Sequence, residues 1–162
     1  MQSSGIGLDL PTEERLLQEV TVRLIDPEEK ARHDQLLEQE HYLGNANAVG
    51  QVLRYVAEYL REWVAVLTFC SSALHLKPRD QFLGWSAQQV RERRHLIAQN
   101  SRFLILPSTG PWPNLASTVL KQVCQRLPED WDSHFGHPVL LVETFVDPQR
   151  FRGTCVLRHA IY

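Results

Sequence analysis

The sequence has few cysteines, and none of them belongs to a paired motif. Cys70, Cys124 and Cys155 are widely spaced along the chain, and no Cys-x-x-Cys pair is present. This spacing excludes a zinc ribbon and a thioredoxin-type redox motif. Each cysteine is therefore predicted to be a small, buried apolar residue in a protein of a reducing compartment.

The sequence also lacks long apolar runs and an excess of charge of one sign. No stretch approaches the roughly 20 consecutive apolar residues of a membrane span, and the first residues lack a signal-peptide pattern. With 17 Lys and Arg against 19 Asp and Glu, the formal charge of −2 gives no global reason to bind nucleic acid, although a local basic patch is compatible with it. At 162 residues, 43% of them hydrophobic, the chain is expected to form one soluble, cytoplasmic domain.

Helix signals are present in four segments. Each begins with a residue that can cap a helix N-terminus. The first two carry glutamates in their first turn, where the helix dipole favours negative charge, and the last has the clearest helical stripe of apolar residues. The predicted helices begin at about Thr12, run from Asp26 to about Glu40 and from Ser86 to about Gln99, and run from Asn114 to Leu127, where Pro128 ends the last.

Strand signals define the rest of the fold. Gln51–Tyr59 alternates between two faces, and Trp63–Phe69 is nearly all apolar, as in a central strand covered on both sides. The short link between them favours an antiparallel hairpin, with a helix through Val52–Leu60 as the alternative. Further strands are predicted at Arg102–Pro107 and Val139–Val146, and an irregular stretch at Leu76–Gly84. This order predicts an α/β (α+β) domain with a mixed, partly antiparallel sheet and flanking helices.

Glu143 is the candidate catalytic residue. In the last predicted strand it shares an otherwise apolar face with Leu141 and Phe145. A carboxylate desolvated there would have a raised pKa and could act as a general base near neutral pH. The alternative is a carboxylate at the end of a strand that finds a basic partner or reaches solvent.

A basic cluster is the candidate nucleic-acid site. Arg91 and Arg94 share a flank of the third predicted helix, and Arg102 follows in the next strand. Such a patch could contact the phosphates of nucleic acid or of a nucleotide cofactor. The alternative is a solvated helix face on which the arginine stems cover apolar surface.

The turn before the last predicted helix is a candidate anion site. Backbone N–H groups at a helix N-terminus favour a pyrophosphate, and Gly110, Asn114, Ala116 and Ser117 keep this turn small or polar. No glycine-rich phosphate motif is present, and strand–loop–helix units of this kind are commonest as plain scaffold. Asp132, His134 and His137 lie close together, but a short loop supplies poor zinc geometry without a further ligand, and no metal site is predicted.

Several unusual strings recur in an order that resembles the DruA-like family. They are His41-Tyr42-Leu43-Gly44, Arg79-Asp80, Gly84-Trp85-Ser86, Asn100-Ser101-Arg102-Phe103-Leu104-Ile105-Leu106-Pro107, Asn114-Leu115-Ala116-Ser117, Asp130-Trp131, Glu143-Thr144-Phe145-Val146-Asp147 and Arg150-Phe151-Arg152-Gly153-Thr154-Cys155. The resemblance divides the chain into an N-terminal helical segment (1–40), a DruA-like domain (41–155) and a divergent tail (156–162).

The resemblance implies a role in mobile elements or their control. DruA-like proteins occur in prokaryotic anti-phage islands of the Druantia type and beside or fused to transposases, so defence-system or transposase proteins and DNA are the implied partners. The tail after Cys155 departs from the family pattern, which predicts a truncated copy. Truncation would expose a sheet edge and favour a homo-oligomer. The resemblance assigns neither an enzymatic activity nor a cofactor.

The element order is also similar to the acyl-CoA N-acyltransferase fold. In that fold the turn before the central helix holds the cofactor pyrophosphate, and the Asn114 turn occupies this place without the usual glycines. Three hypotheses follow. The chain is a DruA-like accessory protein acting on or near nucleic acid, or an acyltransferase-like enzyme that uses acyl-CoA with Glu143 as base, or an inactive truncated remnant.

Overall fold

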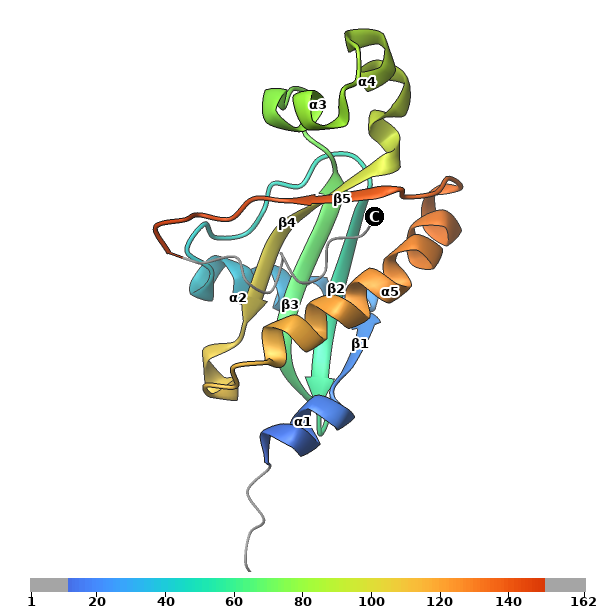
Figure 1. Ribbon diagram of the computed structural model, residues 1–162. Helices are drawn as coiled ribbons and strands as arrows, with labels where there is room; N and C mark the ends of the chain where they lie inside the picture. Colours follow the sequence, from blue (N-terminus) through green and yellow to red (C-terminus); the bar gives the residue numbers. More distant parts are fainter. Residues whose placement is uncertain (1–11, 151–162) are drawn as a thin grey trace, which may run out of the picture.

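A five-stranded mixed sheet forms the centre of the domain (Figure 1). The computed structural model describes residues 12–150 of the chain. The strand order is β1-β2-β3-β4-β5; the first three pairings are antiparallel and β4 pairs with β5 in parallel. This architecture confirms the predicted mixed, partly antiparallel sheet. The strands are β1 (Thr21–Leu24), β2 (Val52–Tyr59), β3 (Glu62–Ser71), β4 (Ile97–Ile105) and β5 (Leu141–Thr144).

Helices cover both faces of the sheet. In Figure 1, α5 crosses the front of the sheet and α2 lies behind it, while α3 and α4 stand beyond its upper end. None of the helices within residues 12–150 is long and apolar enough to cross a membrane. The helices are α1 (Glu13–Glu19), α2 (Lys30–Glu40), α3 (Lys77–Leu83), α4 (Ala87–Arg93) and α5 (Leu115–Phe135), with short 3₁₀ turns at Pro27–Glu29, Arg94–Leu96 and Pro107–Thr109.

Two apolar layers hold the helices to the sheet. On the α5 side, Trp131 is fully buried and packs in one cluster with Tyr55 and Phe69 of the central strands. On the α2 side, Leu37 packs with Val66 and their neighbours. Burial of large apolar side chains is the main favourable term in folding. The covered centre explains why the predicted central strand is almost wholly apolar.

The third helix and the strand after it have different limits from those predicted. The capping box of Ser86 is present, since its hydroxyl accepts from the N–H of Gln89 and the Gln89 side chain accepts from the N–H of Ser86. The prediction that this helix reaches Gln99 is wrong, because Ile97 and Ala98 are buried in β4, where Ile97 pairs with β5 and Ala98 pairs with both β3 and β5. Tertiary pairing overrides local helix propensity here.

Residues expected to break helices lie inside or at the limits of helices. Pro128 was expected to end the last helix, but α5 continues past it to Phe135, with buried Trp131 on its core face. Gly136, in the left-handed region, ends the helix instead. The stretch expected to be irregular contains α3, because Pro78 fits a first helical turn and Gly84 is a left-handed C-cap.

Strand β1 was not predicted. The first predicted helix begins at Thr12 as expected, but it ends at Glu19. Four residues then pair with β2, and the Arg23 guanidinium binds the carboxylates of Glu29 and Glu58. The ion pair with Arg23 lowers the pKa of Glu29 to about 2. A strand this short leaves too few residues for an alternating pattern to be recognised.

Tyr55 and Tyr59 on β2 allow the contribution of one buried hydrogen bond to stability to be measured with a matched control. Both side chains are buried, but Tyr55 donates to Asp130 of α5 at 2.9 Å, whereas the Tyr59 hydroxyl has no partner among the described residues. We expect Tyr55→Phe to lower the free energy of unfolding by about 1.5–3 kcal/mol, the usual contribution of a hydrogen bond to a charged group. Tyr59→Phe should leave it unchanged or raise it. Urea unfolding would measure both, and equal losses would contradict this assignment.

His33 predicts a loss of stability in mild acid. Its side chain is fully buried, and Nε2 lies 3.1 Å from the Leu67 carbonyl oxygen, which can only accept, so Nε2 carries the proton of a neutral ring. Burial lowers the pKa of His33 below 6.5. Its contribution is therefore full above the unfolded-state pKa and lost as the pH falls toward the folded-state pKa.

The expected result is a free energy of unfolding that decreases as the pH falls from 7 to 5. His33→Gln keeps an N–H donor but does not titrate, so the variant should be less stable at pH 7 and less sensitive to pH. Denaturant unfolding across this pH range would measure the difference. An equally steep decrease in the variant would exclude His33 as its source.

Candidate functional site

A pocket of about 620 Å³ opens where β3 ends and β4 begins. Cys70 pairs with Gln99 across these strands, so both side chains lie on one face of the sheet, the face covered by α2. Residues 46–50, after α2, form the opposite wall. Gly50 has a positive φ, and a Cβ there would lie 2.6 Å from the Ser71 hydroxyl, so this wall requires a glycine.

A β-bulge in β4 brings two polar side chains to this pocket. Thr68 pairs with Arg102 and Phe69 pairs with Asn100, so Ser101 is an extra residue in β4. In a regular strand Gln99 and Arg102, three residues apart, would lie on opposite faces. The bulge places both on the pocket side, where both contribute to its lining.

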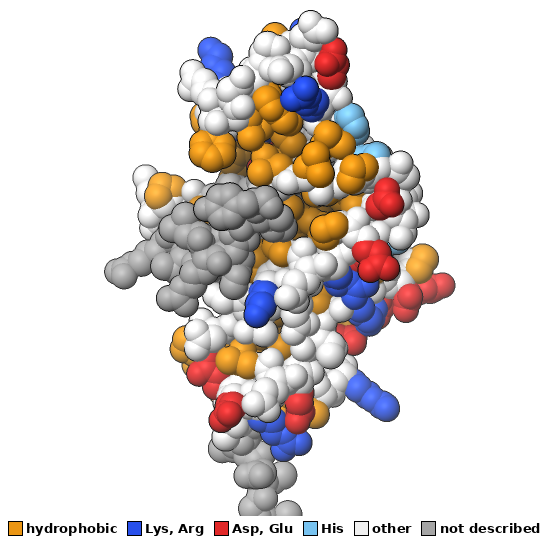
Figure 2. Space-filling model, turned by 45° about the vertical axis from the view of Figure 1, so that its right-hand side comes forward, with side chains coloured by type: hydrophobic (Ala, Val, Ile, Leu, Met, Phe, Trp, Pro, Cys, Tyr) orange, Lys and Arg blue, Asp and Glu red, His pale blue; other side chains and the backbone are white. Residues whose placement is uncertain are grey.

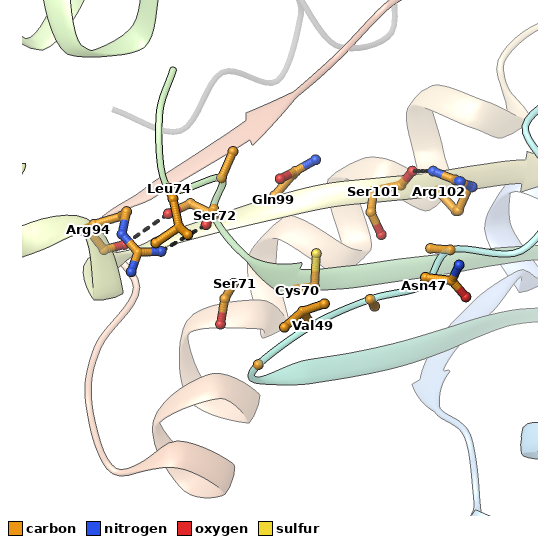
Figure 3. Close-up of a pocket in the computed structure, with 14 residues that line it drawn as sticks. Asn47, Val49, Cys70, Ser71, Ser72, Leu74, Arg94, Gln99, Ser101 and Arg102 are labelled. Carbon is orange, nitrogen blue, oxygen red and sulfur yellow. Dashed lines mark hydrogen bonds between the residues drawn. The ribbon is translucent and has the colours of Figure 1, made fainter. Parts of the chain in front are cut away.

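Two arginines line the pocket. Figure 3 shows Arg94 and Arg102 at its two ends, with Cys70 and Gln99 between them. Arg94 donates to the Ser72 carbonyl at 3.1 Å, and Arg102 donates to carbonyl oxygens, including Gly44 at 2.8 Å. Neither forms an ion pair with a carboxylate of residues 12–150, and no lining residue is acidic. Carbonyl groups orient these guanidinium groups without neutralising them.

The positive charge affects nearby groups. Burial and the Arg102 charge lower the pKa of His41. Burial raises the pKa of Cys70, and this effect outweighs the Ser101 hydroxyl and the Arg102 charge, which both favour the thiolate. Cys70 is therefore held as a neutral thiol, as its prediction as a buried apolar residue implies.

Glu143 lies at the edge of the pocket and is ion-paired. It pairs with Gln99 across β4 and β5, and its Oε2 lies 3.2 Å from Nη1 of Arg79 on α3. Both side chains are over nine-tenths buried. Oε1 also accepts from the N–H of Ala73, which lines the pocket. A basic partner is the alternative interpretation of Glu143 given above, and its role as a general base stays a prediction.

Arg91 lies outside this pocket. It is exposed on α4, whereas Arg94 begins the following 3₁₀ turn and faces the pocket. Of the three arginines in the candidate nucleic-acid site, the structure therefore brings Arg94 and Arg102 together and separates Arg91 from them.

The turn with Asn114, Ala116 and Ser117 lies beyond the other end of β4. A carboxylate of this chain is bound there: Oε1 of Glu13 accepts from the backbone N–H and the side-chain amide of Asn114, both at 3.1 Å. The N–H groups of Ala116 and Ser117 have no acceptor among the described residues. These two N–H groups are the donors with which the turn could bind an external anion. The predicted cofactor site stays a prediction.

Sequence patterns missed the polar lining of the pocket. Gln99 was assigned to a helix, and Ser71 belongs to no recognisable motif. Ser101 was missed because it is the bulge residue of β4, where the alternation of the strand is interrupted. The one available signal was the string from Asn100 to Pro107, which the family resemblance singled out. Within residues 12–150, no three His, Cys, Asp or Glu side chains are arranged to hold a metal ion.

Solved structures with the same fold are acetyltransferases. The chain is similar to an aminoglycoside acetyltransferase, AAC(6')-Ib, in complex with coenzyme A, at a TM-score of 0.55 and 14% identity over 86% of this chain and 82% of that one. A second structure, AAC(6')-Ib with ribostamycin and coenzyme A, matches at a TM-score of 0.52 and 14% identity over 86% and 79%. This likeness confirms the predicted acyl-CoA N-acyltransferase-like fold.

The family follows from a comparison of the whole sequence. No match is found among curated proteins. A family model described as Druantia protein DruA matches residues 11–162, which include the strings quoted above and most of the chain before them. The chain belongs to the DruA family.

Proposed function

We propose that this DruA-family chain is an accessory protein of prokaryotic anti-phage defence or transposon-associated systems, and that it binds nucleic acid. One observation carries the proposal: Arg94 and Arg102 face a single pocket that has no acidic lining residue. Arginine is well suited to phosphate because its planar guanidinium donates several hydrogen bonds at once.

The remaining lining supports a polar, anionic ligand. Ser71, Gln99 and Ser101 supply neutral hydrogen-bonding groups between the two arginines, and Asn47 supplies another near Arg102 (Figure 3). Such groups contact phosphates and sugars in nucleic-acid complexes. A volume of about 620 Å³ is typical of small-ligand sites. It suits a short segment of one strand better than a duplex.

Arg94 and Arg91 allow this proposal to be tested with matched variants. Arg94→Gln should weaken binding to a short single-stranded oligonucleotide by about tenfold, since one charged phosphate contact is lost. The slope of log K against log salt should fall by about 0.7. Fluorescence anisotropy at several salt concentrations would measure both quantities.

Arg91→Gln removes the same charge from the exposed face of α4 and should bind as the parent does. Equal losses in the two variants would indicate general electrostatic attraction, and unchanged binding in Arg94→Gln would refute the pocket as the binding site. Thermal unfolding should be checked, because Arg94 also bonds to Ser72.

A second candidate function is acyl-CoA binding, and the geometry of the β4 edge favours it. Strand β5 pairs with β4 only from Ile97 to Asn100. Strand β5 ends there, at Thr144, and the chain after it runs across the sheet rather than along β4 (Figure 1), so β4 from Ser101 to Ile105 has no strand partner on this edge among the described residues. An open strand edge of this kind can accept an extended ligand through backbone hydrogen bonds.

Acetyl-CoA binding is expected to raise the thermal midpoint of the protein. At a hundredfold excess over the dissociation constant, the added stability would be about 2.7 kcal/mol. Ala116→Trp should abolish this shift by filling the start of α5, where the cofactor would bind, with Glu143 then the candidate base. Gln125→Trp, on the exposed face of the same helix, is the control and should keep the shift. No shift in the parent protein at any concentration would contradict the second candidate.

A further inference from the structure

A two-helix insertion separates β3 from β4. These strands are antiparallel neighbours, and such strands are commonly joined by two to five residues. Here 25 residues, 72–96, lie between them and contain α3 and α4. This segment, called the α3–α4 lobe below, projects beyond the end of the sheet next to the pocket (Figure 1). The fold does not need the lobe to connect the strands.

The lobe is basic in an otherwise acidic chain. It contains five Lys and Arg against two Asp and Glu, a formal charge of +3, whereas the whole chain has −2. Arg79 forms ion pairs with Asp80 and Glu143, so its charge is neutralised within the protein. Lys77, Arg91 and Arg93 are exposed, and Arg94 lines the pocket, so the lobe presents its positive charge to solvent and to the pocket.

The same lobe carries an exposed aromatic side chain. Phe82 of α3 is 85% exposed, more than any other large apolar side chain described. Trp85 is half-buried, with the Arg93 guanidinium 5.9 Å from its ring centre. Figure 2 shows apolar and basic side chains next to one another on this part of the surface. At this exposure most of the Phe82 ring is accessible to a ligand.

Hydrogen bonds join the two ends of the lobe, and one ion pair ties the lobe to β5. Ser72 and Arg94 bond to each other twice, hydroxyl to carbonyl and guanidinium to carbonyl, both at 3.1 Å, which joins the two ends of the lobe. Arg79 also donates to the Ala73 carbonyl at 3.0 Å and holds α3 against β5 through Glu143. Phe82 lies three residues along α3 from Arg79, the side chain that ties this helix to β5.

We propose that the α3–α4 lobe binds nucleic acid with unpaired bases and stacks one base on Phe82. This inference rests on the proposed nucleic-acid function and names its substrate class. Exposed bases offer an apolar face together with charged phosphate, and the lobe carries an exposed ring together with four cations. Proteins that bind single strands combine these features, stacking bases on aromatic rings within a basic surface. An apolar protein surface would leave this charge unmatched.

Phe82 variants of the full chain test the proposal. The probe is a single-stranded oligonucleotide that contains 2-aminopurine, whose fluorescence reports stacking, together with a blunt duplex of the same sequence. Phe82→Ala should weaken binding to the single strand about tenfold and remove the change in fluorescence. Phe82→Trp should restore both. The parent should prefer the single strand to the duplex.

Leu60→Ala is the matched control, because Leu60 is an exposed apolar residue in the turn between β2 and β3, away from the lobe. It should bind as the parent does. Since Phe82 is exposed, none of these variants should lower the thermal midpoint.

The outcomes separate this inference from the proposed function. If the parent and Phe82→Ala bind the single strand equally, with binding still dependent on Arg94, stacking is refuted and the proposed function stands. Equal affinity of the parent for the duplex also refutes the inference. If the parent binds no oligonucleotide at low salt, the proposed function fails with it. If Phe82→Ala changes only the sedimentation of the protein alone, the lobe is a protein contact and the inference is wrong.

Discussion

Strand β3 is buried on both faces and hydrogen-bonded along both edges, and the rest of the structure is arranged around it. Its neighbours β2 and β4 complete the sheet, α5 covers one face and α2 the other. Between Trp63 and Phe69 its side chains are apolar except at Thr68, and the Leu67 carbonyl accepts from the ring of His33 on α2. Polar side chains that could bind a ligand are therefore expected at the ends of β3 and not along it.

The pocket arises at one of these ends from a local irregularity. The bulge at Ser101 adds one residue to β4 and turns Arg102 to the same face as Gln99. Bulges are frequent beside functional sites because they redirect a side chain without disturbing the rest of the sheet. The sheet supplies a rigid base, and the irregular residue supplies the polar group.

Charge is distributed by the fold rather than by composition. The sequence is slightly acidic as a whole, yet the lobe and the pocket hold most of the arginines that no carboxylate neutralises among residues 12–150. Arg79 has a different role, since its pairing with Glu143 ties the lobe to β5. One buried ion pair therefore positions a basic surface, and a lone buried arginine there would be strongly destabilising. The acyltransferase-like fold is thus combined with a basic insertion between its central strands.

Local signals in the sequence determined the β2–β3 hairpin, the caps of α1 and α4 and the start of α5, because each depends on residues close together in the chain. The order of the predicted elements indicated a mixed sheet. The resemblance to the DruA family was also recognised from short sequence motifs, without the structure. Tertiary structure decided where α4 gives way to β4, why Pro128 lies within α5, and that β1 exists. It alone decided the site: Arg94 and Arg102 face one pocket while Arg91 does not, and Glu143 meets Arg79. The physical reason is that pairing partners and burial distant in sequence outweigh local propensity, and a one-residue bulge changes which side chains share a face.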